Sequence, residues 1–188
     1  RRGHDAWSWA ALGALFGPLV VPLALAATKR DRETAPVVAV VHEGRQGAGS
    51  VVALVGVDGS PDAEAAACNT VRLLGPRLGR VILATVLDYD AAREGDAGKV
   101  YVEEAARMLD DAASIFCGLD PDQVVLTGRP ADALVEYARE QAVDVLAVGA
   151  RGRGLSTALL GSVAARAVRQ HDVPVLVAGR PKVADEPR

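Results

Sequence analysis

Cysteine is scarce in this chain, with only Cys68 and Cys117 among its 188 residues. The two show no metal-ligand spacing, and both fall in stretches with helical periodicity. We therefore interpret them as small buried hydrophobic residues rather than as a disulfide. The sequence predicts no metal site.

Several enzyme motifs are also absent. The stretch "GVDGSPDAE" lacks the Gly-x-Gly-x-x-Gly of dinucleotide-binding proteins, and the Gly-Lys-Ser or Gly-Lys-Thr of a Walker loop does not occur. No serine, histidine and acid form a recognisable acyl-transfer motif. Residues 51–180 hold 13 Lys and Arg against 18 Asp and Glu, an excess of negative charge that would repel a nucleic-acid backbone. We therefore expect none of these enzyme classes and no nucleic-acid partner.

Charge is missing altogether from one long run near the start, residues 6–28, "AWSWAALGALFGPLVVPLALAAT". About 20 apolar residues span a bilayer core, so we predict that residues 1–28 form a transmembrane segment. Trp7 and Trp9 lie where an interfacial aromatic belt would place them. The main alternative is a signal peptide, because Ala24-Leu25-Ala26 resembles a cleavage site. A helix buried within protein is a third alternative.

Basic residues flank this run on both sides. Arg1 and Arg2 precede it, and Lys29, Arg30 and Arg32 follow it. Because the more basic flank of a membrane span faces the cytoplasm, we expect a membrane-anchored protein whose C-terminal domain is cytoplasmic.

The next segment, residues 29–50, has the composition of a linker. "TKRDRETAP" is charged and ends in proline, and "HEGRQGAGS" is rich in glycine. Between them "VVAVV", residues 37–41, is either an extra strand or an extended piece, and the sequence leaves both open.

Five short apolar runs rich in valine recur from residue 51 onward, as is typical of strands buried on both faces. They lie at 51–57, 80–86, 123–128, 143–149 and 173–179. Helical patterns fall between them, and the first has Ser60 as a candidate N-cap and Pro61 at its first position. The alternation predicts an α/β domain, a doubly wound five-stranded parallel sheet, over residues 51–180, with a C-terminal tail at 181–188.

Two of these predicted strands lead into residues suited to binding a ligand. The first runs into Asp58, and the fourth runs into the glycine-rich loop "GARGRG". Gly149 and Gly152 would let the backbone approach a ligand closely. Gly161-Ser162 then opens a helix, whose free N–H groups and positive dipole end suit an anion, and Ser162 is a candidate cap. Ligands of doubly wound sheets bind at the carboxyl ends of the strands, so we expect the loop to hold phosphates.

The stretches "VALVGVDGS" and "VGARGRG…LLGSVAARAVRQHDVPVLVAGR" resemble the universal stress protein family over residues 51–180. Nucleotide-binding members carry Gly-x-x-Gly, nine residues, then Gly-Ser or Gly-Thr. The resemblance implies a site for ATP, with Mg²⁺, and a homodimer paired through the last strand, Val173 to Ala178. It places Asp58 and Val86 near the adenosine. Along the loop it places Val148, Gly149, Arg151 and Gly152, and at the phosphates it places Gly161, Ser162 and Val163.

The sequence departs from the family pattern at one point, since only eight residues separate Gly152 from Gly161. The shorter loop either still closes around phosphates or misplaces Gly161 and leaves the site empty. We therefore carry three hypotheses in this order: a membrane-tethered, ATP-binding regulatory module of the stress response, a dimerising interaction domain with a degenerate pocket, and a slow ATP hydrolase.

Overall fold

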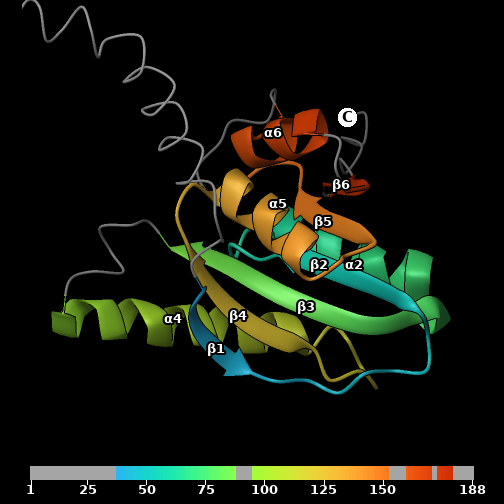
Figure 1. The fold of residues 1–188 in the computed structure, drawn as a ribbon, viewed down its shortest axis with the longest axis horizontal. Helices are drawn as coiled ribbons and strands as arrows, with labels where there is room; N and C mark the ends of the chain where they lie inside the picture. Colours follow the sequence, from blue (N-terminus) through green and yellow to red (C-terminus); the bar gives the residue numbers. More distant parts are fainter. Residues whose placement is uncertain (1–36, 88–94, 153–159, 171–172, 180–188) are drawn as a thin grey trace, which may run out of the picture. The chain divides into compact units, whose positions relative to one another are not determined.

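The computed structural model describes residues 37–87, 95–152, 160–170 and 173–179, with the backbone alone at 95–97. Within these residues a six-stranded sheet carries helices on both faces (Figure 1). The predicted membrane run 6–28 and the predicted tail lie outside the described residues. Among the helices that are described, none is both long enough and apolar enough to cross a membrane.

The order of the strands places a ligand crevice at one end of the sheet. The strands are β1 (Val37–His42), β2 (Val51–Gly56), β3 (Leu78–Leu87), β4 (Asp122–Thr127), β5 (Val145–Gly149) and β6 (Val175–Ala178). Across the sheet they follow the order β1-β4-β3-β2-β5-β6, and every pairing is parallel except β1 with β4. The five predicted parallel strands are confirmed. The winding reverses at β2, between β3 and β5, where doubly wound sheets bind ligands.

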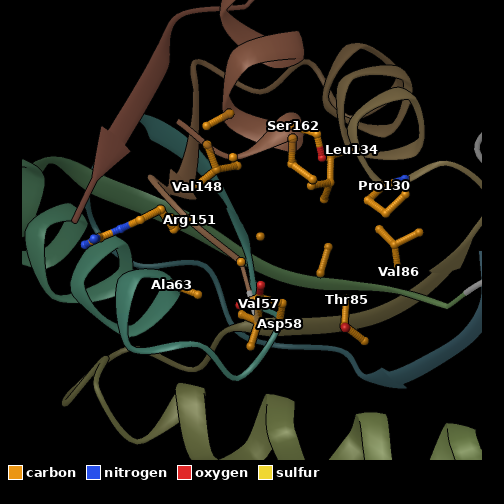
Figure 2. A pocket seen from close by; sticks show the side chains of 17 residues that line it. Val57, Asp58, Ala63, Thr85, Val86, Pro130, Leu134, Val148, Arg151 and Ser162 are labelled. Atoms are coloured by element: carbon orange, nitrogen blue, oxygen red, sulfur yellow. The ribbon is translucent and has the colours of Figure 1, made fainter. Parts of the chain in front are cut away.

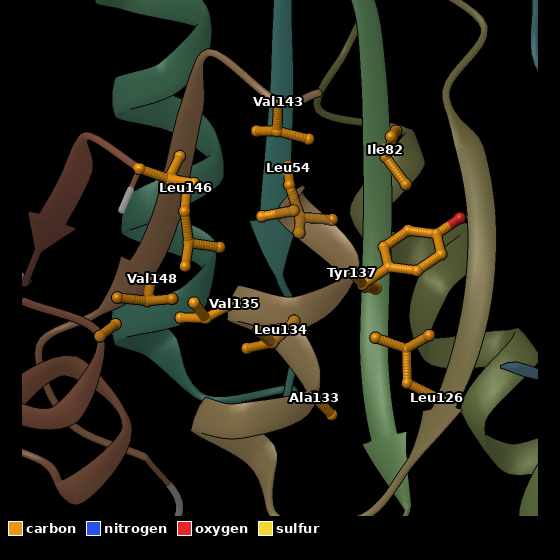
Figure 3. Packing of buried hydrophobic residues seen from close by; sticks show 14 of the residues in the cluster. Leu54, Ile82, Leu126, Ala133, Leu134, Val135, Tyr137, Val143, Leu146 and Val148 are labelled. Atoms are coloured by element: carbon orange, nitrogen blue, oxygen red, sulfur yellow. The ribbon is translucent and has the colours of Figure 1, made fainter. Parts of the chain in front are cut away.

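The centre of the sheet is apolar on both faces. Leu54 of β2 lies in register with Ile82 of β3 and Leu146 of β5, and all three are fully buried. Figure 3 shows these side chains gathered with others against α5 (Pro130–Glu140). The alternating residues Ala53 and Val55 belong to the core on the opposite face. The near-continuous apolar runs of the sequence are therefore explained by burial on both sides.

Four α-helices of the described chain cover the two faces. The helices α2 (Pro61–Leu74) and α4 (Gly95–Ala113) share one core cluster, and α5 and α6 (Ser162–Gln170) share the other. Helix α2 begins as predicted, because the Ser60 hydroxyl accepts a hydrogen bond from the Ala63 N–H at 3.2 Å and Pro61 follows the cap. It ends at Gly75, whose φ of +25° favours glycine, and a 3-10 turn, Gly75–Arg77, leads into β3.

Of the two alternatives for residues 37–41, the structure has the strand. β1 pairs antiparallel with β4, with register shifts along the pair. At its end the His42 Nε2 lies 2.7 Å from the Asp120 Oδ1. The described sheet therefore has one strand more than the five predicted.

The glycine-rich segment after β1 packs against the sheet. The Gly44 N–H donates to the Asp122 carboxylate at 2.6 Å, and the Gly47 N–H donates to the Gly79 carbonyl at 2.6 Å. A Cβ at Gly44 would overlap the backbone of residues 120–122, so only glycine permits this approach. Residues 37–50, which we expected within the linker, are thus ordered parts of the folded unit.

The two cysteines differ from the prediction. Both are exposed rather than buried. Cys68 lies on the outer face of α2, whose buried positions include Ala63, Ala66 and Ala67, and Cys117 lies in the turn that follows α4. The helical periodicity located Cys68 correctly on a helix but on the wrong face of it.

Candidate functional site

A cavity of about 360 Å³ opens at the carboxyl ends of β2, β3 and β5 (Figure 2). Pockets of roughly 300–1,000 Å³ are typical of small-molecule sites. All nine residues that the sequence singled out line this cavity. They are Asp58, Val86, Val148, Gly149, Arg151, Gly152, Gly161, Ser162 and Val163.

Asp58 has two roles in this geometry. Its Oδ1 accepts a hydrogen bond from the Ser60 N–H at 2.9 Å, which orders the turn before α2. Its Oδ2 lies next to the glycine-rich loop, because a Cβ built on Gly152 would lie 2.9 Å from it. The turn is helped by Gly59, whose φ is +69°. The carboxylate is therefore fixed by the turn and presented to the cavity.

The two described ends of the glycine-rich loop meet. The Gly161 N–H donates to the Ala150 carbonyl at 2.7 Å. A Cβ on Gly161 would lie 3.6 Å from the Gly152 nitrogen. The eight-residue spacing therefore does not displace Gly161 from the cavity, although residues 153–159 themselves lie outside the described part of the chain.

Helix α6 begins at the cavity. Its first residue is Ser162, and the Gly161 carbonyl accepts the first helical bond, from the Ala165 N–H at 2.9 Å. Gly161 therefore occupies the position before the helix, and Ser162 is the first helical residue rather than the cap that we predicted. The opening N–H groups of an α-helix have no partner within the helix, and its N-terminus carries partial positive charge. This end of the cavity suits an anion.

Arg151 lines the cavity, but its guanidinium binds elsewhere. The Nε lies 2.7 Å from the Asp62 Oδ2 and the Nη2 lies 3.2 Å from the Asp62 Oδ1. Figure 2 shows the side chain extending away from the other labelled residues, toward α2. The hydrogen bond to Asp62, together with the charge of that carboxylate, raises the pKa of Arg151. The sequence could not show this partner, which lies 89 residues earlier.

An apolar end of the cavity was missed by the sequence analysis. Pro130 and Leu134 of α5 lie beside Val86, on the far side of the cavity from Arg151 (Figure 2). Pro130 opens the helix that follows β4, and that strand end meets the same edge of the sheet. A proline just after the predicted strand 123–128 was the available signal. The cavity is also lined by Gly56, Val57, Ala63, Ala84, Thr85 and Ala164.

Charge is sparse among the described residues of the cavity. Of these, Asp58 and Arg151 have charged side chains, and the Arg151 guanidinium is bound to Asp62. The described residues include no cluster of three or more His, Cys, Asp or Glu side chains that could hold a metal ion. At the described residues, an anionic ligand would therefore be held chiefly by backbone N–H groups.

The fold and this cavity define a doubly wound α/β domain with a glycine-loop site at its switch point. Among known families, the model described as "Universal stress protein family" matches residues 51–179. The chain belongs to that family. β1 lies outside the matched range.

Individual relatives agree with the assignment. Universal stress protein MJ0531 of Methanocaldococcus jannaschii is 42% identical over 59 residues, 31% of this chain and 35% of the relative. Universal stress protein Mb2028c of Mycobacterium bovis is 28% identical over 138 residues, 66% of this chain and 46% of the relative. The chain thus spans less than half the length of these relatives. A crystal structure of a universal stress protein in complex with cAMP is 28% identical, with a TM-score of 0.53, over 71% of this chain and 100% of that one.

Proposed function

We propose that this stress-response domain binds an adenine nucleotide, ATP with Mg²⁺, in the cavity and acts as a regulatory module. The observation that carries the proposal is the convergence of nine residues from separated parts of the chain on one cavity at the switch point of the sheet. The 28% identical neighbour in complex with cAMP supports an adenine nucleotide as the ligand class.

The two ends of the cavity suit the two ends of a nucleotide. The apolar group of Val86, Pro130 and Leu134 offers a surface for the base. The glycine-rich loop and the start of α6 offer backbone N–H groups to the phosphates. In this proposal backbone N–H groups hold the phosphates, and the described arginine of the loop, Arg151, need not contact them.

Mg²⁺ would fit a site of this kind. The ion is usually held by one or two carboxylates together with substrate phosphates. Asp58 is the carboxylate that lines the cavity among the described residues, but the family resemblance places it near the adenosine, so the phosphates themselves would carry the ion. The metal would neutralise phosphate charge.

The test of nucleotide binding is a thermal melt of the full chain with and without ATP and Mg²⁺. A ligand at about 100 times its Kd stabilises the folded state by about 2.7 kcal/mol, so we expect a clear rise in Tm. No rise at millimolar ATP and Mg²⁺ would contradict the proposal and put the interaction-domain hypothesis first. Slow hydrolysis, the third hypothesis, is measured by product release over hours under saturating ATP.

We also propose that the chain forms a homodimer through β6. This strand ends the described sheet, and its Val175, Leu176 and Val177 are only partly buried. An uncovered edge exposes unpaired backbone groups, which a two-fold related strand can pair. Val175→Lys should shift the protein from dimer toward monomer in sedimentation, with the matched substitution Val168→Lys on the exposed surface of α6 as control. An unchanged dimer places the contact elsewhere.

Membrane anchoring through residues 6–28, with the domain in the cytoplasm, remains our proposal for the first part of the chain. It rests on the uncharged run and its basic flank. Fractionation of cells that express the full chain tests it, since recovery in the soluble fraction or an N-terminus near Ala27 would contradict it.

A further inference from the structure

Arg151 is the one charged side chain of the glycine-rich loop that the structure describes, and it points away from the cavity. Two roles are open to such a residue in a nucleotide site. It either swings back to bind phosphate, or it holds the loop in the shape that binds phosphate. The contacts around it distinguish the two.

The Arg151–Asp62 pair has the geometry of a fixed contact. Two nitrogens of one guanidinium meet two oxygens of one carboxylate, at 2.7 and 3.2 Å. The side chain of Asp62 is only 8% exposed and that of Arg151 is 26% exposed. A paired, bidentate arginine of this kind is held in one orientation. Releasing it would leave a buried carboxylate without this partner, which is costly.

The same stretch of loop is anchored by its backbone. The Ser60 hydroxyl donates to the Arg151 carbonyl at 3.3 Å, and the Ala150 N–H donates to the Ala178 carbonyl at 2.6 Å. Gly149 packs so closely on α2 that a Cβ there would lie 2.7 Å from the Ala63 nitrogen. The ion pair is the side-chain member of this set of contacts, and it ties the loop to the first turn of α2.

From these contacts we infer that Arg151 is a positioning residue, with Asp62 as its partner, and that its guanidinium is not a phosphate ligand. The pair fixes the loop backbone so that its N–H groups face the phosphates. Asp62 does not line the cavity, so we expect its contribution to binding to act through the loop that Arg151 holds. This inference rests on the proposed nucleotide site.

The two roles predict opposite effects for Asp62→Asn. If Arg151 were a phosphate ligand held back by Asp62, neutralising the carboxylate would free the arginine and strengthen ATP binding. If the pair positions the loop, the same change weakens ATP binding. The contact with adenosine lies at the apolar end of the cavity, so a positioning role leaves adenosine affinity unchanged.

The experiment measures Kd for ATP and for adenosine by calorimetry on the full chain and its variants. Asp62→Asn, Arg151→Ala and Arg151→Lys each disrupt the bidentate pair, and Arg151→Lys does so while keeping the positive charge. Asp122→Asn is the matched control, because it weakens the part-buried Arg80–Asp122 pair, also 2.7 Å between Nε and a carboxylate oxygen, and Asp122 begins β4, at the opposite end of that strand from the cavity. Melting without nucleotide identifies the temperature at which all variants are folded.

We expect Asp62→Asn and Arg151→Ala each to weaken ATP binding about tenfold, as for loss of a charged hydrogen bond, with adenosine affinity unchanged within about twofold. The double variant should lose no more ATP affinity than the single variant that binds ATP more weakly, because the two residues act as one unit. Arg151→Ala should leave the salt dependence of ATP binding unchanged.

Three results would overturn the inference. Tighter ATP binding by Asp62→Asn would make Arg151 a phosphate ligand, and an equal loss of ATP and adenosine affinity would make the pair a general stabiliser of the fold. ATP binding by the parent chain with no change in any variant would remove the pair from the site. A parent chain that binds neither ligand refutes the proposed nucleotide site itself, which is a separate outcome.

Discussion

Gly149 and Gly152 lie three positions apart in one loop, yet the structure predicts that a methyl group at each will affect a different property. A Cβ on Gly149 would lie 2.7 Å from the Ala63 nitrogen and 2.9 Å from the Asp62 carbonyl carbon. Both atoms belong to the backbone at the start of α2. Among the described residues, a Cβ on Gly152 would meet one neighbour, the Asp58 Oδ2 at 2.9 Å.

The expected loss of stability depends on which atoms each methyl group would displace. Gly149→Ala forces the backbone of α2 away from the loop, and overpacking of this kind costs about 1–3 kcal/mol. A loss of about 2 kcal/mol lowers Tm by about 4–8 °C in a chain of this size. Gly152→Ala should change stability by about 0.5 kcal/mol or less, as is usual for a site outside the core.

For Gly152→Ala we expect a clear loss of ATP affinity despite the small change in stability. Its methyl group would press on the Asp58 Oδ2 and displace a carboxylate that lines the proposed site. We expect ATP affinity to fall about tenfold, equivalent to about 1.4 kcal/mol. Because neither glycine has a positive φ, the effects come from contacts of the methyl group and not from backbone strain.

Urea unfolding without nucleotide and calorimetry with ATP measure the two properties separately. Equal stability of Gly149→Ala and the parent would refute the close packing of the loop on α2. Undiminished ATP binding by Gly152→Ala, in a parent chain that binds ATP, would refute the placement of the ligand against Gly152 and Asp58.

Three further predictions concern the rest of the domain. Leu54→Ala removes a fully buried side chain from the central strand and should cost about 3 kcal/mol in urea unfolding; a cost below about 1 kcal/mol would contradict the packing of β2. Gly44→Ala should detach β1 and speed amide hydrogen exchange at residues 37–42 but not in β2, since its methyl group would overlap neighbouring backbone; unchanged exchange would show that the strand is held otherwise. Burial, partly offset by Arg80, raises the pKa of Tyr137 above its ordinary value of 10.0. The folded chain then keeps a proton that the unfolded chain loses, so stability that is complete below about pH 10 should decline as pH rises through the folded pKa. Tyr137→Phe should decline less over this range in urea unfolding, and an identical decline would assign the effect to other groups.

The parallel part of the fold and the location of the site were predictable from the sequence. Strands buried on both faces give continuous apolar runs, and the carboxyl ends of parallel strands must meet at one edge of the sheet. Asp58 follows one such run and Gly149 ends another, so their convergence on one cavity required no knowledge of side-chain packing.

Other features depend on contacts that no local pattern encodes. β1 finds its partner β4 across 78 residues, as the His42–Asp120 contact shows. The long side chain of Arg151 could reach either the cavity or α2, and the choice was decided by a buried carboxylate in another element. Pro130 lines the cavity because the helix after β4 starts at the same edge of the sheet as the glycine-rich loop.

The central claim is that the cavity lined by Asp58 and the glycine-rich loop binds an adenine nucleotide. Calorimetric titration of the full chain with ATP in the presence of Mg²⁺ tests it most directly, with Gly152→Ala as the matched variant. We predict saturable heat from a single class of site in the parent chain and a binding curve about tenfold weaker in the variant. Absence of saturable heat at millimolar ATP, from a parent chain shown by its melting transition to be folded, would contradict the account.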